Sequence, residues 1–117
     1  MSLKLKKVDT FKARVHLVLL GTDADRSQEA SFVAEFRHID RERFDALLAS
    51  SPSDAEVIDQ VLVGVAEVTD DDGNPLPFET ARDAIKADLS YAGATVRTFF
   101  ESLAGAPAKN SNRSRAR

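Results

Sequence analysis

The 117-residue chain contains no cysteine and no tryptophan, and it has only five glycines. The absence of thiols excludes disulfide bonds, thiolate metal sites and cysteine nucleophiles. The glycines are isolated from one another, so the chain has no glycine-rich loop of the kind that binds phosphate groups. The longest apolar run, residues 15–20, is interrupted by His16 and is too short to cross a bilayer. We therefore expect a soluble, cytoplasmic protein without a membrane partner.

Acidic charge predominates outside the C-terminal segment. The net charge is −3, but the final stretch, AKNSNRSRAR, contains four basic residues and no acid, so the rest of the chain carries −7. An acidic surface repels nucleic acid, and any such contact would have to come from the tail. We assign residues 1–104 to a single domain. Residues 105–117 are expected to be a disordered basic tail, because this segment has no large apolar residue.

Alternation of apolar and polar residues predicts two strands near the N-terminus. The alternation runs along FKARVHLVLL, residues 11–20, and along EASFVAEFRHI, residues 29–39. The segment between them is polar and too short for a crossover helix, so we expect an antiparallel hairpin.

Helical spacing of apolar residues follows from residue 40 onward. Asp40 is a candidate N-cap for a helix whose apolar positions are Phe44, Leu47 and Leu48. A second helix is predicted from the capping-box spacing of Ser53 and Glu56, and its apolar stripe continues to residue 68. The β-branched content of VLVGVAEV, residues 61–68, keeps a strand open as an alternative there.

Two further helices are predicted after the acidic loop that follows residue 68. The first begins near Thr80 or Asp83, and the last runs from about Tyr91 to Leu103, where Gly105 and Pro107 end it. The expected fold class is α+β, with an N-terminal antiparallel β-hairpin followed by four or so packed α-helices.

The acidic loop TDDDGNPLPF favours a turn over a calcium site. Counted from Asp70, an EF-hand loop would need glycine at position 6 and glutamate at position 12, but these are Pro75 and Ala81. Gly73 is free to adopt positive φ, and Pro75 fixes the exit from the turn. The predicted structural turn residues are Asp70, Gly73, Pro75, Pro77 and Phe78.

The residues typical of catalysis or metal binding are few. His16 and His38 are the only histidines, and although neighbouring strands could bring them together, no cluster of acids accompanies them. The chain has no G-x-S-x-G motif and no recognisable Ser-His-acid arrangement. We therefore predict no enzyme activity, no metal and no cofactor.

The last predicted helix contains the best candidates for partner binding. Adjacent helical residues point about 100° apart, so Phe99 and Phe100 cannot both face the same core. Packing in the core and contact with a partner are both open for this stripe. The candidate partner-binding residues are Tyr91, Val96, Phe99, Phe100 and Leu103.

The order of these segments resembles the tail assembly chaperones of long-tailed bacteriophages and prophages. The similarity covers residues 29–103 and is carried by FVAEF, IDRERFDALLAS and GVAEVTDDDGNPLPFE. In that family the last segment has the form V-x-G-W-x-x-V-x-D-x-x-G-x-P-L-P-F-S. This chain has Val65 where the family usually has tryptophan, and Glu79 where it has a small hydroxyl residue.

The resemblance implies a non-enzymatic role in tail morphogenesis. Chaperones of this family coat the tape measure protein while tail tube subunits assemble around it. The resemblance therefore implies two partners, the tape measure protein and the tail tube protein, and leaves self-association into a homo-oligomer open. The chain would act in the cytoplasm of the bacterial host and be absent from the mature virion. Many such genes also make a longer product by a −1 frameshift, for which Ala108, Lys109 and Asn110 are a candidate slip point.

Two other functions are open on the sequence. A small head–tail joining or tail-completion protein would remain in the virion after assembly. A nucleic-acid-binding regulator would use the arginines of the tail, and its binding would weaken with salt and disappear on truncation after Gly105.

Overall fold

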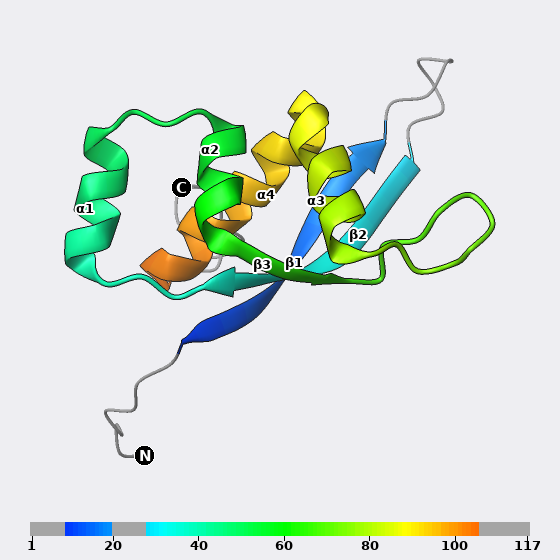
Figure 1. Cartoon of the computed structure of the whole chain (residues 1–117), viewed down its shortest axis with the longest axis horizontal. Helices are drawn as coiled ribbons and strands as arrows, with labels where there is room; N and C mark the ends of the chain where they lie inside the picture. The colour runs from blue at the N-terminus through cyan, green and yellow to red at the C-terminus, as the bar shows by residue number, and fades with distance from the viewer. Residues whose placement is uncertain (1–8, 20–27, 106–117) are drawn as a thin grey trace, which may run out of the picture.

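A computed structural model describes residues 9–19 and 28–105. Within these residues the chain forms a three-stranded antiparallel sheet and four helices, which places it in the α+β class (Figure 1). The predicted class is therefore confirmed, but the sheet has one strand more than the predicted hairpin. The elements are β1 (Thr10–Leu19), β2 (Gln28–Arg37), α1 (Arg41–Ala49), α2 (Asp54–Val61), β3 (Leu62–Ala66), α3 (Phe78–Ala87) and α4 (Leu89–Ala104).

The central strand of the sheet is β2, which pairs with β1 on one side and β3 on the other. The β1–β2 register runs without interruption from Thr10 opposite Arg37 to Leu19 opposite Gln28. Alternate residues of each strand point to opposite faces. The face toward the helices is apolar and the other is mostly polar, with Val18 and Val33 as its apolar members in β1 and β2, so the alternation seen in the sequence corresponds to the two faces of the sheet.

The third strand corrects the prediction that the second helix continues to residue 68. The helix ends at Val61, and Leu62–Ala66 pairs with β2, with a register shift between Glu35 and Phe36. Pairing satisfies the backbone groups along the second edge of β2, and Leu62 is buried on the core face. This long-range pairing outweighs the helical spacing, because strand formation depends on the neighbours that the fold supplies.

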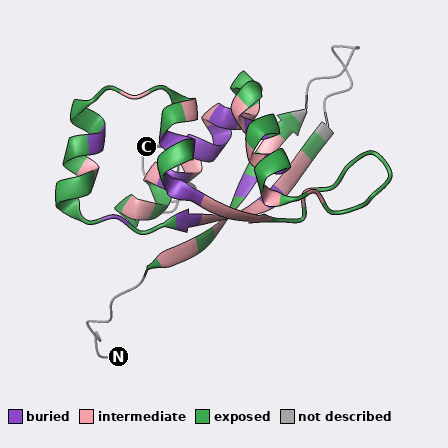
Figure 2. Cartoon of the chain, in the orientation of Figure 1, coloured by how far each residue is buried: buried purple, intermediate pink, exposed green. Residues whose placement is uncertain are grey.

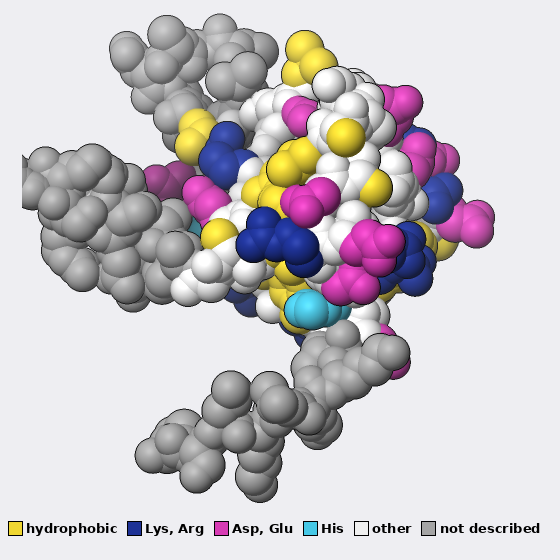
Figure 3. Space-filling model, turned by 90° about the vertical axis from the view of Figure 1, so that its left-hand side faces the viewer, with side chains coloured by type: hydrophobic (Ala, Val, Ile, Leu, Met, Phe, Trp, Pro, Cys, Tyr) yellow, Lys and Arg dark blue, Asp and Glu magenta, His cyan; other side chains and the backbone are white. Residues whose placement is uncertain are grey.

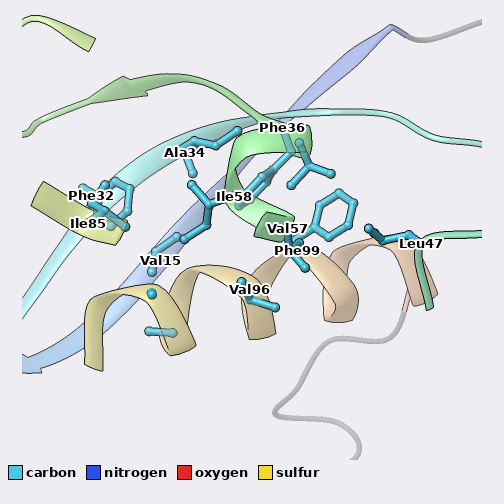
Figure 4. Packing of buried hydrophobic residues seen from close by; sticks show 14 of the residues in the cluster. Val15, Phe32, Ala34, Phe36, Leu47, Val57, Ile58, Ile85, Val96 and Phe99 are labelled. Carbon is cyan, nitrogen blue, oxygen red and sulfur yellow. The ribbon is translucent and has the colours of Figure 1, made fainter. Parts of the chain in front are cut away.

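Most of the core lies between the sheet and α4, with α2 and α3 covering the rest (Figures 2 and 4). Phe36 and Phe99 are fully buried, and their ring centroids lie 5.2 Å apart. Phe11 stacks against Phe99 from β1 with centroids 6.1 Å apart. Thr95 is also fully buried, and its hydroxyl donates to the Tyr91 carbonyl oxygen at 2.8 Å, so its polar group is satisfied.

Local signals place most of the helix ends where the sequence predicts them. The Asp40 carboxylate accepts a hydrogen bond from the backbone N–H of Arg43. Both hydrogen bonds of the Ser53–Glu56 capping box are present at the start of α2. Gly105 ends α4 with a φ of 74°, as a C-cap glycine does.

The start of α3 was predicted wrongly. This helix begins at Phe78, directly after Pro77, and not near Thr80 or Asp83. The backbone φ of Pro77 is −58°, close to the helical value, so the proline sets the chain direction as the helix begins. Arg82, one turn later, places its guanidinium over the Phe78 ring at 5.6 Å from the centroid.

The acidic loop between β3 and α3 forms a closed turn, seen as the loop that extends beyond α3 in Figure 1. The Asp70 carboxylate accepts hydrogen bonds from the backbone N–H groups of Asp72 and Asn74, at 2.9 and 3.0 Å. An isolated bridge joins Thr69 to Pro75, and the Leu76 N–H donates to the Val68 carbonyl oxygen. Asp70 thus serves as the hydrogen-bond acceptor that holds the turn together.

We expect Gly73→Ala to lower the free energy of unfolding by about 1–2 kcal/mol, because Gly73 has a φ of 85°, which costs this much for other residues. The matched control is Gly93→Ala in α4, where the added methyl group meets only an Asp54 carboxylate oxygen at 3.7 Å. That change should stabilise the protein by up to about 1 kcal/mol, the helix-propensity difference between the residues. Urea unfolding measures both, and equal effects of the two substitutions would contradict the turn geometry.

Candidate partner-binding site

The candidate site lies at the end of the molecule where α1 approaches the C-terminal end of α4. Helix α1 follows β2 after a short connection, and the Asp40 cap fixes its first turn. Phe44 and Leu47 are three residues apart and therefore lie on the same side of α1. Leu47 is buried and Phe44 is half-buried, so this is the side that meets the rest of the fold.

Helix α4 contributes the opposite wall. Phe99 points into the core, and Phe100 therefore turns toward α1. The Phe100 ring meets the Phe44 ring edge-on, with centroids 5.7 Å apart, and the Phe99 ring at 5.3 Å. Leu103 follows one turn later and is half-buried. A continuous line of aromatic rings thus runs from the buried core to the surface.

A groove of about 330 Å³ lies between these walls. Its apolar lining includes Phe44, Phe100 and Leu103, which we call the groove floor. His38, Asp40 and Arg41, all exposed, form the polar part of the lining. On the same side of the molecule, hydrophobic side chains lie between charged side chains of both signs (Figure 3). The site can therefore accept apolar side chains of a partner while its rim remains hydrated.

The outer face of α1 differs from the prediction. Leu48, expected on the apolar stripe with Phe44 and Leu47, is 49% exposed. Helix α1 lies beside the sheet and not over it, so only one narrow side is covered (Figure 1). Leu47 and Phe44 occupy that side, and Leu48, about 100° further around the helix, faces away.

The predicted partner-binding residues occupy different environments. Val96 and Phe99 are buried and belong to the core, whereas Phe100 and Leu103 line the groove. Tyr91 is half-buried in the first turn of α4, where its N–H donates to the Asp88 cap. The candidate frameshift residues, Ala108, Lys109 and Asn110, lie outside the described residues.

The sequence did not indicate the groove residues that precede α1 or lie in its first turns. These groove residues are His38, Ile39, Asp40, Arg41 and Phe44. Phe44 was recognised only as part of an apolar stripe, because nothing in the local spacing shows which helix it will meet. The pairing of Phe44 with Phe100 joins positions 56 residues apart and arises only when the helices pack.

The two histidines are widely separated. His16 lies opposite Ser31, and His38 is seven residues further along the chain from Ser31, about 23 Å at the strand rise of 3.3 Å per residue. Within residues 9–19 and 28–105, no group of three or more His, Asp or Glu side chains is arranged to hold a metal ion. The hairpin thus brings these histidines to different ends of the sheet.

An ion pair crosses the polar face of the sheet. The Arg14 guanidinium donates two hydrogen bonds to the Glu67 carboxylate, each 3.1 Å long. This contact lowers the pKa of Glu67 below its ordinary value. Glu67 itself has a φ of 67°, an unusual conformation for a residue with a side chain, and it lies directly after β3. The pair therefore links the exit of β3 to β1 across the intervening strand.

Stability is expected to depend on pH differently in the wild type and in Glu67→Gln. Because the pKa of Glu67 is lowered on folding, the carboxylate stabilises the fold above its ordinary pKa of about 4.3. This contribution is lost as the pH falls through the lower folded value. The melting temperature of the wild type should therefore exceed that of Glu67→Gln by the largest amount above about pH 5, and this difference should shrink below about pH 4. Thermal unfolding across this range measures the difference, and one that grows toward low pH would contradict the ion pair.

No family model, curated protein or solved structure matches this chain. Within the described residues, no helix is both long enough and apolar enough to span a membrane. The interpretation of the groove therefore depends on its own geometry and on the sequence resemblance.

Proposed function

We propose that this chain is a tail assembly chaperone of a long-tailed phage or prophage, which binds the tape measure protein and helps recruit tail tube subunits. The observation that carries the proposal is the groove between α1 and α4, whose floor of Phe44, Phe100 and Leu103 reaches the surface of a small domain. A groove with an apolar floor and a polar rim suits the apolar face of an amphipathic helix. The sequence resemblance to such chaperones supports the same role.

The turn at residues 69–75 has a structural role in the proposed function. It sets the path from β3 into α3, and Asp88 then caps α4 immediately after α3 ends. The turn thus leads, through α3 and the Asp88 cap, into the helix that carries Phe100 and Leu103. In the proposed function, the segment GNPLPF orients the helix that binds the partner and performs no chemistry.

Solubility of the tape measure protein in a bacterial host tests this function. We expect more of that protein in the soluble fraction when it is produced together with this chain than when it is produced alone. An unrelated acidic protein of similar size is the control for an effect of charge on solubility. A tape measure protein that is equally insoluble in both cultures would contradict the proposed function.

The composition of purified virions separates the proposal from the head–tail alternative. A chaperone acts during virion assembly in the host cytoplasm and leaves, so we expect mass spectrometry of purified particles to detect no peptide of this chain. Stoichiometric peptides in the particle would instead support a head–tail joining or tail-completion protein.

A further inference from the structure

We propose that the outer edge of β1, the side of this strand that faces away from β2, binds an extended segment of a partner protein in which apolar residues alternate with acidic ones. The bound segment adds a fourth strand to the sheet. This surface is separate from the groove between α1 and α4, and the proposal does not depend on the proposed function.

The outer edge of β1 is long and regular. Among the residues that the structure describes, β2 is the only strand paired with β1, so Thr10–Leu19 forms one edge of the sheet (Figure 1). These ten residues include no proline, and no bulge interrupts their register with β2. The opposite edge, formed by β3, has only five residues and follows a register shift. A long, regular edge is the kind that pairs with a strand of another chain.

The hydrogen bond that precedes β1 shows which of its backbone groups face outward. The Asp9 carbonyl oxygen accepts from the N–H of His38, and the register of the hairpin places these two residues directly opposite one another. A bond between opposite residues marks a hydrogen-bonded pair, and such pairs alternate with non-hydrogen-bonded pairs along an antiparallel ladder. The odd-numbered residues of β1 therefore bond to β2. The even-numbered residues direct their N–H and C=O groups to the outer edge, and they are Thr10, Lys12, Arg14, His16 and Val18.

The side chains on the open face of this edge favour acidic neighbours. Lys12, Arg14 and His16 are all exposed there, and β1 contains no acidic residue. Acids lie further in, since Glu35 on β2 is opposite Lys12, and Glu67 pairs with Arg14. An added strand places its side chains about 4.5–5.5 Å from those of β1 but roughly 10 Å from those of β2. Its nearest charged neighbour is therefore Lys12, with Arg14 and His16 on either side of it or beyond.

The face of the edge toward the helices offers apolar surface. Phe11, Ala13 and Leu17 lie on this face and are only partly buried, whereas Val15 among them is 0% exposed. The exposed remainder of these side chains is apolar area that a neighbouring strand can bury. Because alternate residues of a strand point to opposite faces, apolar residues of the added strand meet this face while its acids meet the open one.

A second copy of β1 is a poor occupant of the same edge. When two copies pair antiparallel about a twofold axis, hydrogen bonding brings even-numbered residues opposite one another. A pairing centred on Arg14 places Arg14 opposite itself and Lys12 opposite His16. A pairing centred one residue earlier places Lys12 opposite Arg14. Like charges directly opposite destabilise a strand pair, so the edge favours an acidic strand over its own copy.

Amide hydrogen exchange of the full chain, followed by NMR, tests the proposal with two synthetic peptides. The peptides are acetyl-EVEVEVE-amide and, as the matched control, acetyl-KVKVKVK-amide. We expect the glutamate peptide to slow exchange at Lys12, Arg14 and His16, and to change it little at Ala13 and Val15, whose N–H groups already bond to β2. The slowing should reach about tenfold when nine-tenths of the chains are bound, because only the free tenth exchanges. The lysine peptide should leave all five amides unchanged.

Charge reversal at the edge separates an electrostatic preference from an effect on folding. In Lys12→Glu, the glutamate peptide should lose its effect and the lysine peptide should gain one, a result that unfolding cannot produce. Arg97→Glu is the matched control, since it changes the net charge equally at an exposed position of α4, which packs on the other face of the sheet. This variant should keep the wild-type preference.

Four other outcomes would overturn the proposal. Exchange that neither peptide slows would show that the charges of β1 only protect the edge from pairing. Equal slowing by both peptides would contradict the assignment of an acidic occupant. Slowing confined to the groove residues Phe44 and Leu103 would place the peptide there instead. Slowing that occurs without peptide and increases with protein concentration would assign the edge to a second copy of the chain.

Discussion

Replacing Phe99 with alanine is expected to lower the free energy of unfolding by about 3–5 kcal/mol. Phe99 is 0% exposed and contacts Phe11, Phe36 and Phe100, so its loss opens a cavity between α4 and the sheet. Domains of this size are typically stable by about 5–15 kcal/mol, so this substitution should remove a large share of the stability. Urea unfolding followed by circular dichroism measures the effect.

Phe100→Ala is the matched comparison, since it removes the same side chain from the adjacent position of α4. Phe100 is half-buried and its ring lines the groove, so the neighbouring solvent can fill part of the space it leaves. We expect this substitution to cost less than half as much as Phe99→Ala. Equal losses would contradict the distinction between a core ring and a groove ring.

The double variant Phe100→Ser, Leu103→Ser is expected to weaken binding to the tape measure protein by at least tenfold, or about 1.4 kcal/mol. Both side chains belong to the groove floor. Serine replaces their apolar surface with a small hydroxyl group, so less apolar area is buried when an apolar partner binds. The measurements are the solubility of the co-produced tape measure protein and the dissociation constant of the purified complex. Circular dichroism shows whether the variant remains folded.

Leu89→Ser provides the control for this second prediction. Leu89 is 92% exposed at the opposite end of the same helix and belongs to neither the core nor the groove. We expect its replacement to change stability by no more than about 0.5 kcal/mol and to leave tape measure binding unaltered. If Leu89→Ser impaired binding as much as the double variant, the partner would contact the surface near the start of α4 and not the groove.

The sequence alone determined those features that depend on near neighbours in the chain. Alternation in residues 11–20 and 29–39 predicted the β1–β2 hairpin, because the two faces of a strand meet different surroundings. The Ser53–Glu56 box and Gly105 marked helix ends, because caps use backbone groups within one turn. Gly73 predicted the turn because glycine adopts positive φ without steric cost, and its φ is 85°.

Only the tertiary structure decided which segments meet. Residues 61–68 have both helical spacing and β-branched side chains, and the free edge of β2 made Leu62–Ala66 a strand. In the same way, the stripe on α4 did not reveal which phenylalanine faces the core. Phe99 became a core residue because β1 and β2 supply Phe11 and Phe36 on that side, and Phe100 was left to meet Phe44. The groove belongs to this second group, because its walls come from distant parts of the chain and exist only once α1 and α4 pack together.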